Sequence, residues 1–178
     1  VDVITVVQKD VPIYREWVGS LDGDINATIR PQVTGYLMKQ NYREGDAVKK
    51  GQVLFEIDPR TFQSAVDQAV AARSKQQAMH VTAAASLARV KPLAEKNAVS
   101  LKDLDDATGQ ELSARAALDQ ASAALDSAKL NLEFTRITSP IDGIAGIAKA
   151  QIGDLLSPSA QTELTTVSRV DPIKVYVS

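Results

Sequence analysis

Cysteine is absent from this 178-residue sequence, which excludes disulfides, iron–sulfur clusters, thiolate metal sites and cysteine nucleophiles. Aromatic residues make up only 4% of the chain, too few for one large core, so we expect burial to be spread along an elongated shape. The net charge of -2 argues against nucleic acid as a partner, because phosphate binding needs a concentrated basic face. No apolar run approaches the ~18 residues that a membrane-spanning helix requires.

Few side chains are available for catalysis or for binding a metal. The sole histidine, His80, lies in a long helical pattern with no serine or acidic residue at triad spacing, so we expect a surface histidine. The acidic residues Asp103, Asp105 and Asp106 fall where a helix is expected to begin, and carboxylates favour that positive end of the helix dipole. We therefore predict that the protein is not an enzyme and has no catalytic residue, no metal site and no cofactor.

The chain does contain a half-motif that occurs twice, at residues 31–48 and 140–156. In each copy a proline precedes a glycine, Gly-Asp follows ten residues after that glycine, and an aliphatic residue comes two positions later. These positions are Pro31, Gly35, Gly45-Asp46 and Val48 in the first copy, and Pro140, Gly143, Gly153-Asp154 and Leu156 in the second. One small β domain is therefore predicted to be split into two halves. We expect its turns at Gly35, Gly45, Gly51, Gly143 and Gly153.

The segment between the two copies has the pattern of two long helices. Asp58-Pro59 is a favourable helix start, since Asp accepts a bond from a free backbone N–H and Pro suits the first helical position. A stripe of mostly small or apolar residues follows, spaced by three and four: Phe62, Ala65, Ala69, Ala72, Gln76, Met79, Ala83, Ser86, Val90 and Leu93. Spacing of this kind predicts one helical face packed against a partner.

The second helix repeats every seven residues. Its stripe consists of Leu104, Glu111, Leu118, Leu125 and Leu132, with Ala107, Ala114, Ala121 and Ala128 between them. A short polar stretch from Glu95 to Ser100 joins the two helices, so the sequence predicts an antiparallel helical hairpin. Pro92, in the last turns of the first helix, is expected to bend the chain near the apex.

Strand patterns occur on both sides of the hairpin. Residues 3–18 alternate and carry β-branched side chains, with Pro12 limiting them to an edge or a strand start. Residues 53–57 are predicted to form a strand that ends at Asp58, and residues 173–177 a strand at the end of the chain. Because the chain begins Val1-Asp2 without Met and stops within that strand, we expect a processed or truncated form of a longer protein.

These motifs resemble a known family. The segments 33–37, 44–54 and 57–59 are similar to the first half of a biotinyl/lipoyl-like domain, and residues 138–146 with Gly153-Asp154 to the second half. A domain split in this way by a hairpin resembles the periplasmic adaptors, or membrane fusion proteins, of resistance-nodulation-division (RND) type tripartite efflux pumps in Gram-negative bacteria. The resemblance covers nearly the whole chain.

The resemblance implies a mixed α and β, elongated fold. A lipoyl-like β-sandwich would be formed by residues 30–57 with 136–170. The α-helical hairpin would span residues 58–135, with its tip near 93–100. Residues 1–29 with 171–178 would contribute partial β-barrel strands. The family also implies a hexameric ring and a membrane anchor in the full-length protein that this chain does not include.

A biotin or lipoate carrier subunit is the alternative from another class of protein. Such a domain needs a modifiable lysine at the turn between its halves, where this chain has Thr61 and enters a helix instead. Lys39, in Met38-Lys39, superficially matches a biotinylation motif but lies inside the first half, so we interpret it as a solvent-facing strand residue. Covalent modification is therefore not expected.

Three residues at the hairpin tip are candidate partner-binding residues. Arg89, Leu93 and Ser100, spaced by four and then seven, match the tip pattern through which adaptors of this family dock onto TolC-like outer-membrane channels. Each also has a purely structural explanation. Arg89 would be a solvated helix charge, Leu93 would pack on the other helix, and Ser100 with Asp103 would form a capping box.

The function that the resemblance implies is that of a periplasmic protein attached to the inner membrane. It would link an inner-membrane transporter to an outer-membrane channel for the export of drugs or toxic compounds. An adaptor of an ATP-driven exporter or of a type I secretion system shares the split domain and is the alternative within the family.

Overall fold

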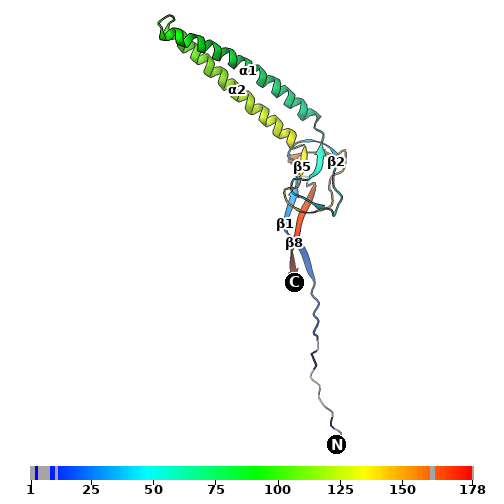
Figure 1. Ribbon diagram of the computed structural model, residues 1–178. Coiled ribbons are helices and arrows are strands. Elements are labelled where there is room, and N and C mark those ends of the chain that lie inside the picture. The colour runs from blue at the N-terminus through cyan, green and yellow to red at the C-terminus, as the bar shows by residue number, and fades with distance from the viewer. Residues whose placement is uncertain (1–2, 4–8, 11, 161–162, 178) are drawn as a thin grey trace.

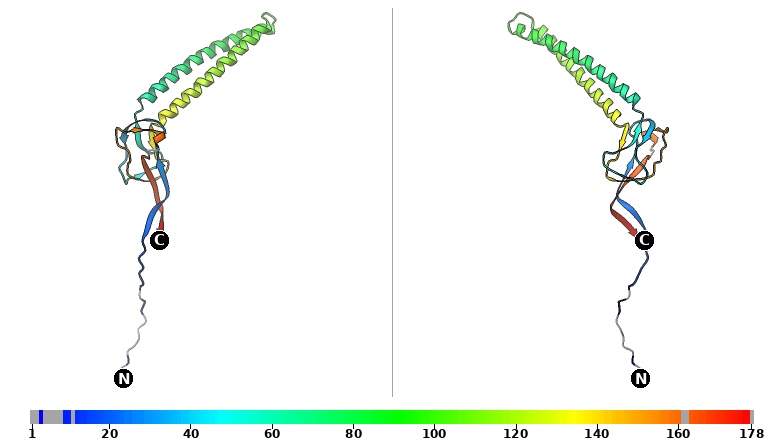
Figure 2. Two further views of the ribbon diagram at one scale, coloured as in Figure 1. Left: turned by 180° about the vertical axis from the view of Figure 1, so that it is seen from behind. Right: turned by 45° about the vertical axis from the view of Figure 1, so that its right-hand side comes forward.

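The computed structural model describes residues 3, 9–10, 12–160 and 163–177 of the chain. The molecule is elongated: a long helical hairpin occupies one end, a small β domain lies in the middle, and a two-stranded ribbon leads away from it on the other side (Figure 1). Both views in Figure 2 show the same order along the long axis. This shape agrees with the low aromatic content, because no single large core is built.

The hairpin consists of α1, Arg60–Glu95, and α2, Leu101–Glu133. Helix α1 begins one position later than predicted, since Pro59 occupies the N-cap rather than the first helical position. Asp58 still serves the helix start, because its Oδ1 accepts the Arg60 backbone N–H at 3.1 Å. The helix continues through Pro92, and residues 96–100 form the connection to α2.

The β domain is a sandwich of two four-stranded sheets. The first has the order β1, β8, β6, β3, with β1 at Gly19–Ile29, β8 at Thr165–Val177, β6 at Gly143–Ala145 and β3 at Ala47–Val48. The second has the order β5, β4, β2, β7, with β5 at Arg136–Thr138, β4 at Val53–Ile57, β2 at Gly35–Gln40 and β7 at Leu155–Leu156. A short 3-10 helix, Pro158–Ala160, follows β7.

The core lies between these two sheets and draws on both halves of the domain. Its fully buried large side chains are Leu37, Leu54, Phe55, Ile57, Leu156, Leu164 and Val167. Tyr42 packs edge-on against Phe55, with ring centroids 5.4 Å apart. The two halves therefore fold into one domain although the whole hairpin separates them in sequence.

Equivalent glycines of the two half-motifs have equivalent roles. Gly45 and Gly153 both have positive φ, 85° and 99°, as their predicted turns require. Gly35 and Gly143 were expected at turns, which is wrong, since each begins a strand. Glycine is needed there for close packing: an added Cβ would lie 2.5 Å from Ile57 Cγ2 at position 35 and 2.5 Å from the Ser168 carbonyl oxygen at position 143. Gly51, at φ 82°, is at a turn as predicted.

The hairpin seam agrees with the sequence in α2 and only partly in α1. Every predicted stripe residue of α2 is buried or half-buried. In α1 the line Phe62, Ala69, Gln76, Ala83 and Val90 faces α2 as predicted. Of the other line, only Ser86 is half-buried, while Ala65, Ala72, Met79 and Leu93 are exposed. The residues that face α2 instead lie one position later, at Val66, Arg73, His80, Leu87 and Ala94. All of these except Arg73 are at least half-buried. Arg73 is exposed, but its Nε donates to Ser122 Oγ of α2 at 3.3 Å.

The predicted strand over residues 3–18 is wrong for residues 3, 9–10 and 12–18, which form no strand, and its other residues lie outside the described part of the chain. Strand β1 begins at Gly19 and pairs with β8 from Gly19 opposite Val177 to Ile29 opposite Thr165. The predicted C-terminal strand is confirmed as part of β8. In the described residues, no helix combines the length and apolar character needed to cross a membrane.

Candidate functional site: the hairpin tip

The end of α1 is closed by the chain's own backbone hydrogen bonds. The Ala98 N–H donates to the Leu93 carbonyl at 2.8 Å, and the Asn97 N–H to the Ala94 carbonyl at 2.9 Å. Asn97 has φ 55°, the left-handed conformation that asparagine tolerates better than most residues. This is a Schellman motif with Asn at the position usually taken by Gly. The loop at the apex therefore has a defined shape in the absence of any partner.

The start of α2 is fixed by a reciprocal capping box. The Asp103 N–H donates to Ser100 Oγ at 3.1 Å, and the Ser100 N–H donates to Asp103 Oδ2 at 3.1 Å. The Ser100 hydroxyl also donates to Asp103 Oδ2 at 2.6 Å. These bonds, the side-chain bond first, lower the pKa of Asp103. The structural explanation for Ser100 is thus confirmed, and its hydroxyl proton is already engaged within the tip.

Leu93 does not belong to the seam. Leu93 is 44% exposed, whereas Val90, three residues earlier, and Ala94, the next residue, are half-buried. The expectation that Leu93 could pack on the other helix is therefore wrong. The exposed Arg89 lies one turn before Leu93, so the two residues share one face of α1. Arg89 also borders a shallow groove with Thr82 and Ser86.

The structure adds an exposed residue at the tip that the sequence did not single out. Leu101, the first residue of α2, is 75% exposed. It lies off the predicted stripe, which begins at Leu104. The one feature of the sequence that could have identified it is an apolar residue directly after an N-cap serine. The apex thus combines two exposed leucines, Leu93 and Leu101, with the guanidinium of Arg89.

His80 was expected at the surface, and this is wrong. Its ring faces α2, where Nε2 lies 3.1 Å from Glu111 Oε1, and the two side chains are only 24% and 18% exposed. Glu111, which appeared as the one polar break in the α2 stripe, is its partner. The sequence alone did not suggest this pair, because the two residues are 31 positions apart and belong to different helices.

No metal-binding cluster of three or more His, Asp or Glu residues occurs in the described part of the chain. Asp103 is part of the capping box, and Asp106 pairs with Lys102 at 2.6 Å. Thr61 lies in the first turn of α1, where a carrier domain would instead turn and present a lysine. Lys39 lies on β2 opposite Glu56 of β4, and its side chain is exposed as predicted.

Comparison with known proteins gives the chain a family. Residues 25–168 match the model "RND MFP, barrel-sandwich hybrid domain". The chain is 35% identical over 178 residues to the multidrug efflux pump subunit AcrA of Escherichia coli K12, covering 100% of this chain and 45% of AcrA. It is 37% identical over 180 residues to the multidrug resistance protein MdtA of Pantoea ananatis, covering 100% of this chain and 43% of MdtA.

A solved structure supports the same assignment. A MacA-MexA chimera that contains the Pseudomonas aeruginosa MexA α-hairpin domain superposes with a TM-score of 0.61 and 30% identity, over 85% of this chain and 50% of the chimera. The chain spans less than half the length of AcrA and of MdtA. Its split sandwich, its inserted hairpin and the family match over residues 25–168 together show that it belongs to the RND membrane fusion protein family.

Proposed function

We propose that this chain is the hairpin-bearing part of a periplasmic adaptor. The adaptor links an inner-membrane transporter to an outer-membrane channel for the export of drugs or toxic compounds, and it has no catalytic role of its own. The observation that carries the proposal is the hairpin tip, where Leu93 is 44% exposed on the same face as Arg89. Relatives of the chain that are 35% and 37% identical are named as multidrug efflux or resistance proteins.

The proposal assigns a role to each part of the chain. Residues 58–135 reach the channel, and residues 30–57 with 136–170 form the body that carries the hairpin. Residues 1–29 with 171–178 contribute to a β-barrel that the longer protein completes. The exposed apolar side chains of Leu21, Ile173 and Val175 on the β1–β8 ribbon support that last assignment, because exposed apolar surfaces usually contact another part of the protein or a partner. The longer protein is also expected to attach to the inner membrane.

The chemistry of the tip suits docking onto another helical tip. Leu93 offers apolar surface and Arg89 offers a fork of N–H donors that fits a carboxylate or carbonyl oxygens. The Ser100 oxygen gives one proton to Asp103 and accepts one N–H, which leaves it one acceptor lone pair. These three residues are therefore proposed to contact the channel directly.

A single contact of this kind is expected to be weak. Two helix ends can bury only a few hundred Å², well below the ~1,600 Å² of a standard stable interface. Several adaptors that bind one channel together would gain avidity without any new contact. We therefore include a ring of adaptors, with six copies as the resemblance implies, in the proposed function.

The native lack of cysteine allows a direct test in cells. Leu93→Cys, placed in the protein as the cell produces it, should form cross-links to single cysteines at the periplasmic end of the channel. Lys75→Cys is the matched control, since Lys75 is an exposed residue in the middle of α1. Cross-links from position 93 and not from position 75 are the expected result. Cross-links from position 75 alone would mean that the hairpin lies alongside the channel, and tip docking would be wrong.

A further inference from the structure

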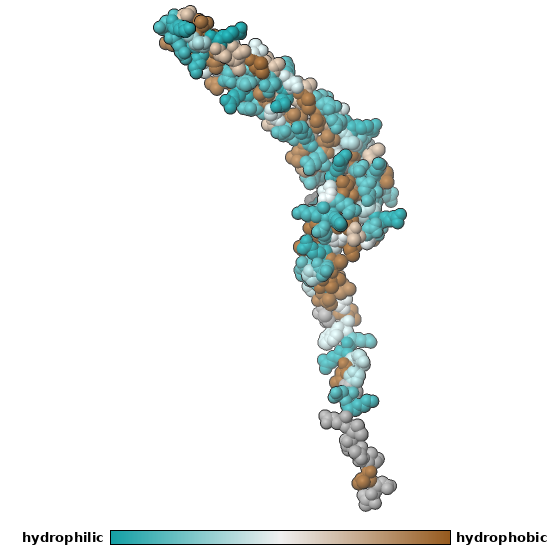
Figure 3. Space-filling model, in the orientation of Figure 1, coloured by the Kyte–Doolittle hydropathy of each residue, from teal (hydrophilic) through white to brown (hydrophobic). Residues whose placement is uncertain are grey.

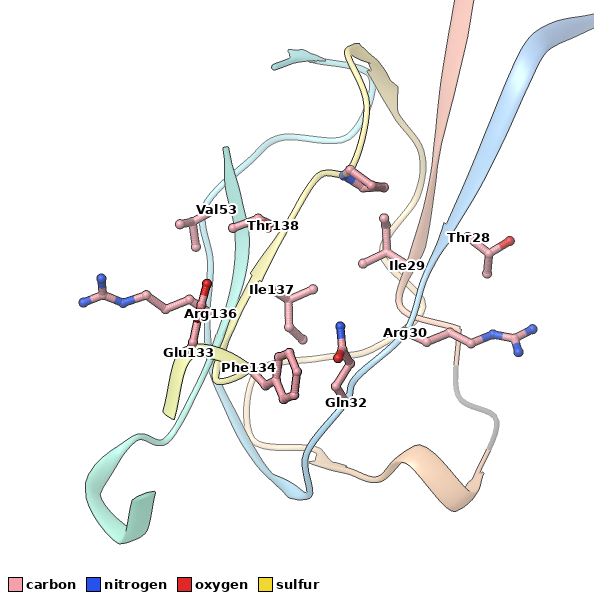
Figure 4. Close-up of a pocket in the computed structure, with 11 residues that line it drawn as sticks. Thr28, Ile29, Arg30, Gln32, Val53, Glu133, Phe134, Arg136, Ile137 and Thr138 are labelled. Atoms are coloured by element: carbon pink, nitrogen blue, oxygen red, sulfur yellow. The ribbon is translucent and has the colours of Figure 1, made fainter. Parts of the chain in front are cut away.

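The two ends of the hairpin differ in the apolar surface that they offer to a partner. Near the root, a cavity of about 570 Å³ lies between the end of β1 and strand β5 (Figure 4). The side chains of Ile29 and Ile137 extend into this space, yet the two residues are only 4% and 7% exposed. The guanidinium groups of Arg30 and Arg136 extend away from it. The innermost apolar side chains of the cavity are therefore already covered by the sandwich itself.

The apex exposes two leucines instead. Leu93, near the end of α1, is 44% exposed, and Leu101, the first residue of α2, is 75% exposed. Leu101 is the most exposed large apolar residue of the two helices in the described chain. Figure 3 shows apolar side chains among polar ones at this end of the molecule. One exposed leucine is ordinary on a protein surface, so the position of Leu101 decides what its exposure means.

The fold holds these two leucines at one place. The Ala98 N–H donates to the Leu93 carbonyl at 2.8 Å, so the chain returns to Leu93 three residues before Leu101. Three residues span at most about 11 Å, because consecutive Cα atoms are ~3.8 Å apart. The capping box, in which the Asp103 nitrogen lies 3.1 Å from Ser100 Oγ, fixes the backbone at the start of α2. Both leucines are therefore held at the apex before any partner binds.

The stability of the hairpin gives no reason for a leucine at position 101. Since Leu101 is 75% exposed, its side chain has little apolar contact with the rest of the chain. The first turn of a helix favours carboxylates, because they interact with the positive end of the helix dipole. A glutamate at this position would therefore suit the start of α2 at least as well as leucine does. A contact with another molecule, by contrast, accounts for an apolar side chain at this point.

Positive charge lies next to the two leucines. Residues 89–100 carry three cations, Arg89, Lys91 and Lys96, and one carboxylate, Glu95, which gives this segment a net charge of +2. All three cations are exposed, and none forms an ion pair within the described residues. An apolar centre with uncompensated cations beside it fits a partner surface in which carboxylates or carbonyl oxygens border an apolar pocket.

We propose that Leu101 is an apolar anchor of the tip, which enters, together with Leu93, an apolar pocket at the periplasmic end of the outer-membrane channel. The cations of residues 89–96 then meet carboxylates or carbonyl oxygens at the rim of that pocket. This inference rests on the proposed function and adds a contact residue to Arg89, Leu93 and Ser100. A channel with a polar surface at this point would bind less tightly, so Leu101 also contributes to the choice of channel.

The substitution Leu101→Glu separates docking from folding. It is made in the protein as the cell produces it, with Ala98→Cys, an exposed residue of the tip loop, as the cross-linking reporter so that Leu93 stays in place. The yield of cross-links to single cysteines at the periplasmic end of the channel is measured far from saturation. This yield should fall at least about tenfold, because a carboxylate is strongly disfavoured in an apolar pocket. The Tm of the variant should equal or exceed that of the parent.

Two matched variants complete the test. Leu112→Glu makes the same change at a leucine that is 57% exposed in the middle of α2, and it should leave the yield unchanged. Leu101→Met keeps an apolar side chain of similar volume and should retain most of the cross-linking. An unchanged yield in Leu101→Glu would overturn the proposal, as would equal losses in Leu101→Glu and Leu112→Glu. A loss accompanied by a lower Tm would mean that position 101 acts through folding, which would also overturn it.

The failure of this inference can be told apart from the failure of tip docking. Cross-links from Ala98→Cys and Leu93→Cys that persist in full with Leu101→Glu would reject only the role of Leu101. The absence of cross-links from both reporter positions, with Leu101 in place, would reject the proposed docking and this inference with it.

Discussion

Nε2 of His80 on α1 lies 3.1 Å from Oε1 of Glu111 on α2, so the only histidine of the chain joins the two arms of the hairpin. Both side chains are less than one-quarter exposed, within a seam otherwise made mainly of alanine and leucine. Polar groups placed inside a helix pair fix which residues face each other, because a shift along the helix axis would leave them unpaired. The pair therefore helps to set the alignment of the two arms.

Removing one member of this pair should cost more than removing both. His80→Leu or Glu111→Leu leaves the other group half-buried without its partner, and each should lower the free energy of unfolding by about 1 kcal/mol. The double change His80→Leu with Glu111→Leu should be neutral or stabilising, because apolar groups then fill the seam. Denaturant unfolding of the four proteins measures this difference. Additive losses in the single and double variants would show that the two residues do not interact.

Ser100→Ala should destabilise the start of α2 by about 1 kcal/mol, the usual cost of losing an N-cap. The loss should appear as faster amide exchange in the first turn of α2, because the Asp103 N–H loses its side-chain acceptor and keeps only the Ser100 carbonyl oxygen. Ser100→Thr keeps a capping hydroxyl and serves as the matched variant. If alanine weakens docking to the channel and threonine does not, the hydroxyl accounts for the effect, as a cap or as an acceptor; equal weakening by both would mean that the contact requires the smaller side chain of serine.

The capping box should also depend on pH. The pKa of Asp103 is lowered because the Ser100 hydroxyl and then the Ser100 N–H donate to its carboxylate. A lowered pKa means that this carboxylate adds stability above the ordinary aspartate value of ~3.9, and that the contribution is lost as pH falls through the lowered pKa. NMR titration should show the pKa of Asp103 rising toward the ordinary value in Ser100→Ala. An unchanged pKa in that variant would contradict the assigned cause.

Two glycine substitutions should have opposite effects. Gly153 has φ 99°, where a side chain is strained, so Gly153→Ala should destabilise the β domain by about 1 kcal/mol or more. Gly109 lies within α2 with open space around the position of an added Cβ, so Gly109→Ala should stabilise the hairpin by about 0.5–1 kcal/mol. Thermal unfolding compares the two, and stabilisation by both changes would contradict the turn geometry at Gly153.

The half-motifs made the β domain predictable, since closely packed glycines and turn glycines leave a pattern in the sequence. The seam of α1 was predictable only in part, for a physical reason. Alanine covers several faces of this helix, so Ala65 and Ala72 looked as suitable for the seam as Ala69. The correct second line contains Arg73 and His80, polar residues that a search for apolar stripes rejects.

Contacts across the hairpin explain why those polar residues are tolerated. Arg73 reaches Ser122, and His80 reaches Glu111, so neither is left without a partner. Neither pairing can be read from one helix alone. The strand predicted over residues 3–18 shows the same limit: alternation describes a side-chain pattern, whereas a strand also needs a neighbouring strand, and β8 pairs only with residues from Gly19 onward.

The hairpin leaves the β domain through adjacent strands, because β4 leads into α1, α2 leads into β5, and β4 and β5 pair with each other. The Ile57 N–H donates to the Thr135 carbonyl at 2.8 Å and ties the two exits together. Both ends of the helical insertion therefore join the β domain at one place, where β4 and β5 pair. Whole turns can be added to or removed from its arms without moving any strand of the sandwich, so its reach is able to evolve separately from the body that carries it.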